Sequence, residues 1–175
     1  MIKKLLSIDL TPCEIVARDL GHPYFPIEAL RGLIAGDGVD LIETLVTLVE
    51  RVPDDNPEAI AANRMNFTRK QHALEEAGAR VVPAPAKRLP DGSFKQSDDQ
   101  RLVIATLSLA LRLRPDFVVL AAADGDFAPM VWELRNVGIR TEVMARPQML
   151  ASDLRRAAYS IIDLDDVLNH VGGTR

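Results

Sequence analysis

The sequence is poor in the residues that several kinds of site require. It holds one cysteine, Cys13, which excludes an intrachain disulfide and leaves no second thiol for a cysteine-based zinc site. No apolar run approaches the roughly 20 residues that cross a bilayer. The first residues turn charged too soon for a secretion signal. We therefore expect a cytoplasmic protein that does not engage a membrane.

Two common catalytic signatures are missing as well. The chain has no glycine-rich phosphate loop, which argues against nucleotide binding of the P-loop kind. It shows no Ser-His-Asp or Cys-His set, and we expect its histidines, His22, His72 and His170, at the surface. At 175 residues, 47% of them hydrophobic, the chain suits one domain. We expect that domain to span residues 1–175, with a core over about 3–166 and a short C-terminal tail.

Strand and helix patterns alternate along the chain. Apolar, β-branched runs predict strands over residues 3–9, 44–49, 79–82, 117–122, 140–144 and 160–164. Helical spacing and capping residues predict helices over 13–20, 26–34, 58–77, 98–112, 127–137 and 151–158. Residues 83–94, punctuated by prolines, are expected to form a loop, and turn residues predict another at 53–57. This alternation predicts an α/β fold with a mainly parallel central sheet and helices on both faces.

Carboxylates gather where these strands end. Asp124 and Asp126 follow the apolar strand at 117–122, and Asp9 ends the first strand. Asp98 and Asp99 begin a helix that follows a crossover. All five can approach one rim of a parallel sheet, where ligands bind in open α/β folds. Each acid also has a simpler interpretation, since Asp9 can close a turn, Asp126 can cap a helix and acids favour helix N-termini.

The basic residues are concentrated in the middle of the chain. Residues 1–60 carry five basic and eleven acidic side chains, whereas residues 61–101 carry eight and five. Arg69, Lys87, Arg88 and Lys95 are candidates to meet phosphates beside the acidic rim. A solvated helix and loop of mixed charge explains them equally well.

The helix at 98–112 has two distinctive features. Ser97 and Gln100 fit a capping box at its start. Its apolar residues cover most of the circumference, so we expect it to be deeply packed or used in self-association, which makes a homodimer an open alternative.

These motifs together resemble a known family. Lys95 followed by Asp98 or Asp99, an apolar helix, a strand, the segment DGDF-x-P (residues 124–129) and ELRNVG (133–138) is similar to the NYN domains of the PIN-like nuclease group. The resemblance covers residues 7–166 and implies a Rossmann-like PIN fold. It also implies an acidic pocket for Mg²⁺ or Mn²⁺ and hydrolysis of RNA by metal-activated water.

The resemblance assigns roles to the same acids. It implies catalytic roles for Asp9, Asp98, Asp99, Asp124 and Asp126, with Asp9, Asp99, Asp124 and Asp126 as metal ligands; it leaves open which of Asp98 and Asp99 faces the site. The chain departs from the family at three places. Pro12 stands where the family usually has an asparagine after the first acid. Ala122-Ala123 stands where the family has a hydroxyl before the DGDF acid, and Ile104 or Ala105 stands where it has an acid in the helix.

Three functions follow as hypotheses. The first is a metal-dependent ribonuclease whose basic residues, Arg69, Lys87, Arg88 and Lys95, neutralise RNA phosphates. The second is a catalytically weak or inactive NYN module that binds RNA or a protein partner, which the three departures favour. The third keeps the fold and assigns the acids to another Mg²⁺-dependent phosphoryl chemistry.

Overall fold

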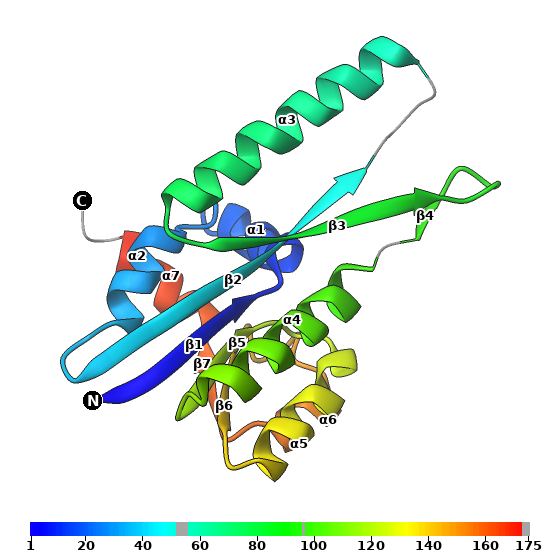
Figure 1. Cartoon of the computed structure of the whole chain (residues 1–175). Coiled ribbons are helices and arrows are strands. Elements are labelled where there is room, and N and C mark those ends of the chain that lie inside the picture. The colour runs from blue at the N-terminus through cyan, green and yellow to red at the C-terminus, as the bar shows by residue number, and fades with distance from the viewer. Residues whose placement is uncertain (52–55, 96, 173–175) are drawn as a thin grey trace.

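A twisted sheet runs through the centre of the molecule (Figure 1). The computed structural model describes residues 1–51, 56–95 and 97–172, so most of the loop expected at 53–57 lies outside the described residues. Within the described residues the sheet has seven strands in the order β4-β3-β2-β1-β5-β6-β7. The strands are β1 (Ile2–Ile8), β2 (Val39–Arg51), β3 (Arg80–Arg88), β4 (Phe94–Lys95), β5 (Phe117–Ala121), β6 (Arg140–Ala145) and β7 (Ser160–Asp163).

Six of these strands are parallel, and only β4 runs antiparallel to its neighbour β3. The helices are α1 (Leu10–Asp19), α2 (Ile27–Ile34), α3 (Pro57–Glu76), α4 (Asp98–Leu113), α5 (Ala128–Asn136), α6 (Ser152–Ala157) and α7 (Leu164–Gly172). A short 3₁₀ turn, η1 (Gly125–Phe127), precedes α5. The α/β fold with a mainly parallel sheet and helices on both faces, predicted from the sequence, is confirmed.

The sheet separates two hydrophobic cores. On one face, side chains such as Leu102 of α4 and Leu134 of α5 pack against Val118 and Leu120 of β5. On the other face, α1, α2 and α7 pack against the alternate residues of the same strands, Val119 and Ala121 among them. Because both faces of β5 are covered, its residues 118–121 are fully buried, which explains the unbroken apolar run.

One predicted loop is wrong. The prolines at 83–94 led to the expectation of irregular structure, yet β3 continues through Pro83 and Pro85 to Arg88, and β4 returns as a hairpin. Pro83 and Pro85 are two residues apart, so both imide nitrogens face the same side of the strand. Since β2 pairs with β3 along its other side, we infer that the prolines face the open edge and remove no hydrogen bond of the ladder.

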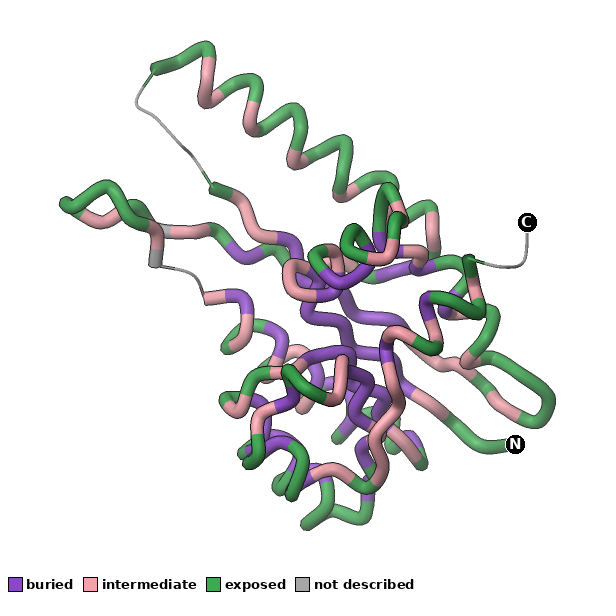
Figure 2. The backbone as a smooth tube through the Cα atoms, turned by 180° about the vertical axis from the view of Figure 1, so that it is seen from behind, coloured by how far each residue is buried: buried purple, intermediate pink, exposed green. Residues whose placement is uncertain are grey.

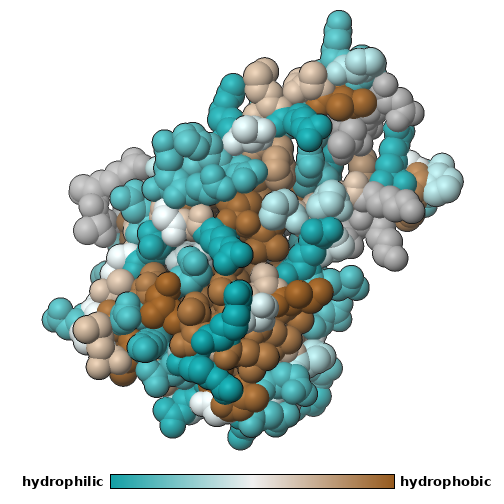
Figure 3. Space-filling view, in the orientation of Figure 1, coloured by the Kyte–Doolittle hydropathy of each residue, from teal (hydrophilic) through white to brown (hydrophobic). Residues whose placement is uncertain are grey.

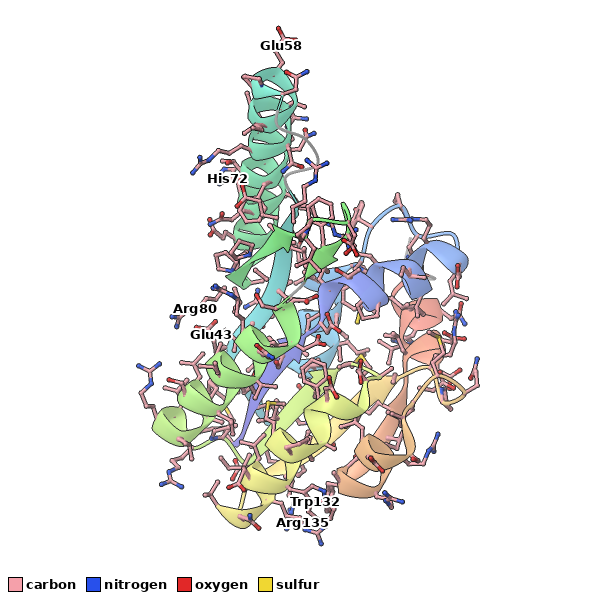
Figure 4. The ribbon with its side chains drawn as sticks, turned by 90° about the vertical axis from the view of Figure 1, so that its right-hand side faces the viewer. Glu43, Glu58, His72, Arg80, Trp132 and Arg135 are labelled. Atoms are coloured by element: carbon pink, nitrogen blue, oxygen red, sulfur yellow. The ribbon has the colours of Figure 1, made fainter. Side chains whose placement is uncertain are left out.

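The end of β2, the hairpin and α3 project beyond the body of the protein, and the tube in Figure 2 is largely green there. α3 is 20 residues long and contains no buried residue. Glu58 lies at the far tip of α3, and His72 lies nearer the sheet (Figure 4). Asn56 caps the helix, because its side-chain oxygen accepts a hydrogen bond from the amide of Glu58.

α4 is less deeply packed than its composition suggests. It buries Leu102, Thr106 and Leu109 against the sheet, whereas Ile104 is 68% exposed on the outward face. The space-filling view shows hydrophobic surface on this side of the molecule (Figure 3). Ser97 is the N-cap residue but makes no capping hydrogen bond through its side chain, so the capping box is wrong. Self-association through the outward face of α4 stays a proposal.

The C-terminal end of the described chain forms α7, where the sequence analysis predicted no helix. Leu168 of this helix is 1% exposed and belongs to the second core. None of the described helices combines the length and the apolar character needed to cross a membrane.

Candidate metal centre

Asp9 and Asp124 are brought to one rim of the sheet by strand pairing. β1 and β5 are parallel neighbours, with Ile8 opposite Ala121, and the amide of Asp9 donates to the carbonyl of Ala121 over 3.0 Å. Asp9 then acts as the N-cap residue of α1, and Asp124 as that of η1. The carboxyl ends of the two strands therefore deliver both acids to the same place.

α4 delivers two further acids from its first turn. Its N-terminal residues include Asp98, which is 7% exposed, and Asp99, which is half-buried. The helix is tied to β1 by a buried hydrogen bond between the hydroxyls of Ser7 and Thr106, 2.7 Å apart. This contact lies in the same strand as the residues leading into Asp9, so it links the strand end to the helix that carries the other acids.

The carboxylates form two groups that share one residue. Carboxylate oxygens of Asp9, Asp98 and Asp99 lie within 4.8 Å of one another, and so do those of Asp99, Asp124 and Asp126. The first group is the more buried, whereas Asp124 and Asp126 are exposed. The structure thus brings together all five acids named from the sequence, and Asp99 belongs to both groups.

Crowding and burial change the acidity of this site. Burial raises the pKa of Asp9 to about 7, with the negative charges of Asp99, Asp98 and Asp124 adding to the rise. Burial also raises the pKa of Asp99 to about 6, followed by repulsion from its acidic neighbours. A hydrogen bond with Thr47 acts in the opposite direction on Asp9. Without a cation, Asp9 is therefore partly protonated near neutral pH.

The residues present suit a divalent cation. Asp9 Oδ1 is buried and has no hydrogen-bond partner among the described residues, which is costly unless another ligand reaches it. Carboxylate oxygens are the ligands that Mg²⁺ and Mn²⁺ prefer. A cation would relieve both the repulsion and the unpaired oxygen.

The acid that caps the turn after β5 is not the one that the simpler interpretation of the sequence named. The carboxylate that caps η1 is Asp124, whose Oδ1 accepts from the amide of Asp126 over 3.1 Å. The alternative in which Asp126 caps the next helix is therefore wrong. Asp126 is left exposed beside Asp99 and Asp124.

The candidate RNA-binding residues are less closely gathered. Arg69 is exposed on α3, which packs on the face of the sheet opposite α4. Arg88 is exposed at the end of β3. Lys87 and Lys95 pair across the hairpin, but their side chains lie outside the described residues. No contact among the described residues brings Arg69 to the acids.

The sequence analysis missed one polar residue beside Asp9, Thr47, and one basic residue on α4, Arg101. Thr47 of β2 lies against Asp9, and its Oγ1 accepts from the amide of Leu10 over 3.1 Å. Arg101 follows Asp98 by three residues on α4, and its guanidinium donates to the carbonyl of Pro83 over 3.3 Å. The helical spacing could have placed Arg101 one turn after Asp98. No signal in the sequence could have placed Thr47 beside Asp9, because that contact depends on the pairing of β1 with β2.

The positions at which the chain departs from the NYN pattern can be located in the structure. Ala122 is buried and Ala123 is half-buried, so no side-chain hydroxyl precedes Asp124. Ile104 is exposed, which leaves Ala105 as the candidate position nearer the packed face of α4. Thr47 of the neighbouring strand β2 lies beside Asp9, and its hydroxyl donates to the carbonyl of Ile8 over 3.4 Å.

Comparison with known proteins decides the family. The model of the NYN domain matches residues 23–165, which is most of the chain. The chain belongs to the NYN domain family. The match includes the acids of α4 and of the DGDF segment, whereas Asp9 precedes it.

A solved structure shares the fold of this chain. A protein of unknown function from Vibrio parahaemolyticus is 19% identical to this chain, with a TM-score of 0.70 and coverage of 95% of this chain and 94% of that one. MurG of Acinetobacter baumannii is 12% identical, with a TM-score of 0.49 and coverage of 92% and 41%. The first likeness establishes the shared fold alone. Comparison with curated proteins finds no match.

Proposed function

We propose that this NYN domain is a metal-dependent ribonuclease that hydrolyses RNA phosphodiester bonds at its cluster of aspartates. The observation that carries the proposal is that Asp99 belongs to both groups of acids. Within each group, carboxylate oxygens lie within 4.8 Å of one another. Such a concentration of negative charge favours a bound Mg²⁺ or Mn²⁺ ion. Membership of the NYN family supports the same chemistry.

The acids divide into ligands and supporting groups. Asp9, Asp99, Asp124 and Asp126 would hold the cation, and Asp98 lies beside Asp9 and Asp99, where it adds to the negative field. When bound, a divalent cation supplies a water of lowered pKa and neutralises charge on the phosphate. The raised pKa of Asp9 means that cation binding has to release a proton near neutral pH.

Basic residues at the projecting hairpin and on α4 would position the RNA. Arg101 is exposed one turn from Asp98, and its guanidinium is held between the carbonyl of Pro83 and the hydroxyl of Ser97. Arg88, Lys87 and Lys95 belong to the hairpin, and Arg69 is exposed on α3, which packs on the face of the sheet opposite α4. Contacts of this kind fix the backbone of a nucleic acid without reading its sequence.

A second candidate function is a weakly active or inactive NYN module that binds RNA or a protein partner. Ala122 and Ala123 favour it, because they offer no hydroxyl beside Asp124. Losing one polar group that stabilises the transition state typically lowers the rate about 10²–10³-fold. The hydroxyl of Thr47 beside Asp9 favours the active enzyme instead.

A cleavage assay separates the two functions. Labelled single-stranded RNA is incubated with Mn²⁺ or Mg²⁺ and the wild-type protein, with an EDTA control. Asp124→Asn is the test variant, and Asp153→Asn is the matched control because Asp153 is exposed on α6 and pairs with Arg156. We expect cleavage by the wild type and the control only. No cleavage above EDTA by a folded wild type would reject the ribonuclease and favour the binding module.

A further inference from the structure

The outward face of α4 carries an apolar stripe. Ile104, Leu107 and Leu111 follow one another at intervals of three and four residues, so they lie along one side of the helix. Ile104 is 68% exposed and Leu111 is 44% exposed, whereas Leu107 between them is half-buried against the core on this face of the sheet. Figure 3 shows hydrophobic surface over α4, which lies at the front of Figure 1. Contiguous apolar surface of this kind is typical of an interaction site.

Arginines border one side of this stripe. Arg101 and Arg112 are eleven residues apart, which is three turns, so they occupy the same flank of α4. Both are exposed, and both are held along the helix. Arg101 donates to the hydroxyl of Ser97 over 3.3 Å, and Arg112 donates to the carbonyl of Ser108 over 3.1 Å. Neither arginine has an acidic partner among the described residues.

α4 offers no acid to balance these arginines. It contains none after its first turn, whose two aspartates belong to the candidate metal centre. Beside α4, Glu43 and Arg80 lie on the adjacent strands β2 and β3 (Figure 4), and Glu133 and Arg135 lie on α5. Each of these pairs is one acid and one base, so neither pair adds net charge. A partner that docks on α4 therefore meets an apolar stripe with a positive border.

Two other occupants fit this surface less well. A second copy of the chain, paired antiparallel through the stripe, would set the arginine flank against itself, because a two-fold axis maps each flank onto its own copy. Like charges that face each other oppose association. A parallel pairing would leave the arginines unpaired, since the opposite flank of α4 carries no acid. Single-stranded RNA binds by stacking its bases on aromatic side chains, and the stripe holds none.

We propose that the stripe of α4 is the docking site of a protein partner that presents an amphipathic helix with an acidic border. Apolar residues of that helix pack on Ile104, Leu107 and Leu111, and carboxylates about three turns apart pair with Arg101 and Arg112. Charge complementarity then selects the partner and its orientation. Arg101 is also a proposed RNA contact, so a docked partner competes with RNA there. This consequence alone rests on the proposed function.

Fluorescence anisotropy with a matched pair of labelled peptides tests the docking site. Each peptide is an alanine-based helix of about 20 residues, long enough to be helical, with a leucine stripe at the spacing of α4. One peptide carries glutamates three turns apart beside its stripe, and the other carries lysines there. We expect the full-length wild type to bind the glutamate peptide saturably and the lysine peptide at least about tenfold more weakly. Asp124→Asn should bind like the wild type, whether or not the protein cleaves RNA.

Variants of α4 separate packing from charge. Ile104→Gln and Leu111→Gln should each weaken binding of the glutamate peptide about tenfold, since each removes an apolar side chain that the peptide buries. Ile15→Gln is the matched control, because Ile15 is 50% exposed on α1, at the other face of the sheet. Arg112→Glu should reverse the preference, so that the lysine peptide binds more tightly than the glutamate peptide. Circular dichroism checks that each variant is folded.

Other results would overturn the proposal. Absence of saturable binding, or equal affinity for the two peptides, would reject an acidic partner. Equal affinity of the wild type, Ile104→Gln and Leu111→Gln for the glutamate peptide would reject the stripe. Sedimentation of the free protein tests the second copy: we expect a monomer, and a dimer that Ile104→Gln dissociates would assign the stripe to self-association. Weaker binding of single-stranded RNA by Ile104→Gln, with peptide binding unchanged, would assign it to RNA.

Discussion

The side-chain hydroxyl oxygens of Ser7 and Thr106 lie 2.7 Å apart, and both residues are fully buried. Ser7 belongs to β1, which leads into Asp9, and Thr106 lies two turns after Asp98 and Asp99 on α4. A buried hydrogen bond thus fixes the strand that positions one acid against the helix that positions two others. We therefore expect this contact in the core to help hold the acids in alignment.

Breaking that bond should destabilise the fold. Thr106→Val leaves the Ser7 hydroxyl buried and unpaired, which should lower the free energy of unfolding by about 1–3 kcal/mol. Ser7→Ala combined with Thr106→Val removes both polar groups, so the double variant should lose less stability than the sum of the single variants. Urea denaturation of all four proteins measures the coupling. Strict additivity would show that the two hydroxyls do not stabilise each other.

The elevated pKa of Asp9 predicts how stability changes with pH in the metal-free protein. Its pKa rises from 3.8 to about 7 on folding, so between these values the folded state binds more protons than the unfolded chain. Stability should therefore fall as the pH rises across this window. Asp9→Asn removes the buried charge and should stabilise the protein at pH 8 by about 2 kcal/mol, with little gain near pH 4.

Denaturation in EDTA across this pH range measures the effect. Asp37→Asn is a suitable control, because Asp37 is exposed in the turn before β2. The control should follow the wild type at every pH. If Asp9→Asn and Asp37→Asn show the same pH dependence, burial does not raise the pKa of Asp9.

The position of Arg101 predicts a contribution to RNA binding. Arg101→Gln should weaken binding of a single-stranded RNA and reduce the slope of log affinity against log salt by about 0.7, the value for one phosphate contact. Arg112→Gln, at the other end of the same helix, is the matched control. Fluorescence anisotropy in EDTA at several salt concentrations measures both. An unchanged slope for Arg101→Gln would remove this residue from the RNA surface.

Much of the fold could be predicted because its signals are local. The run at 117–121 is apolar at every position, as a strand covered on both faces requires. Asp9 and Asp124 directly follow their strands, so the parallel order alone predicted that they approach one rim. These two acids required no knowledge of side-chain packing.

Other features depend on pairing that the sequence does not display. Pro83 and Pro85 read as loop residues until β3 is known to pair with β2 on one side only. Whether Asp98 or Asp99 faces the site could not be decided from spacing, and the structure places both there, with Asp99 shared. Thr47 reaches Asp9 from a neighbouring strand, a contact set by the register of that pair.

The central claim is that the aspartate cluster binds a divalent cation through Asp99. Titration calorimetry with Mn²⁺ at pH 7.5 tests it most directly, using the wild type, Asp99→Asn and the exposed control Asp153→Asn. The account predicts saturable binding by the wild type and the control, and affinity at least about tenfold weaker in Asp99→Asn, which loses a ligand shared by both groups. No binding by the wild type, or equal affinity in all three proteins, would contradict it.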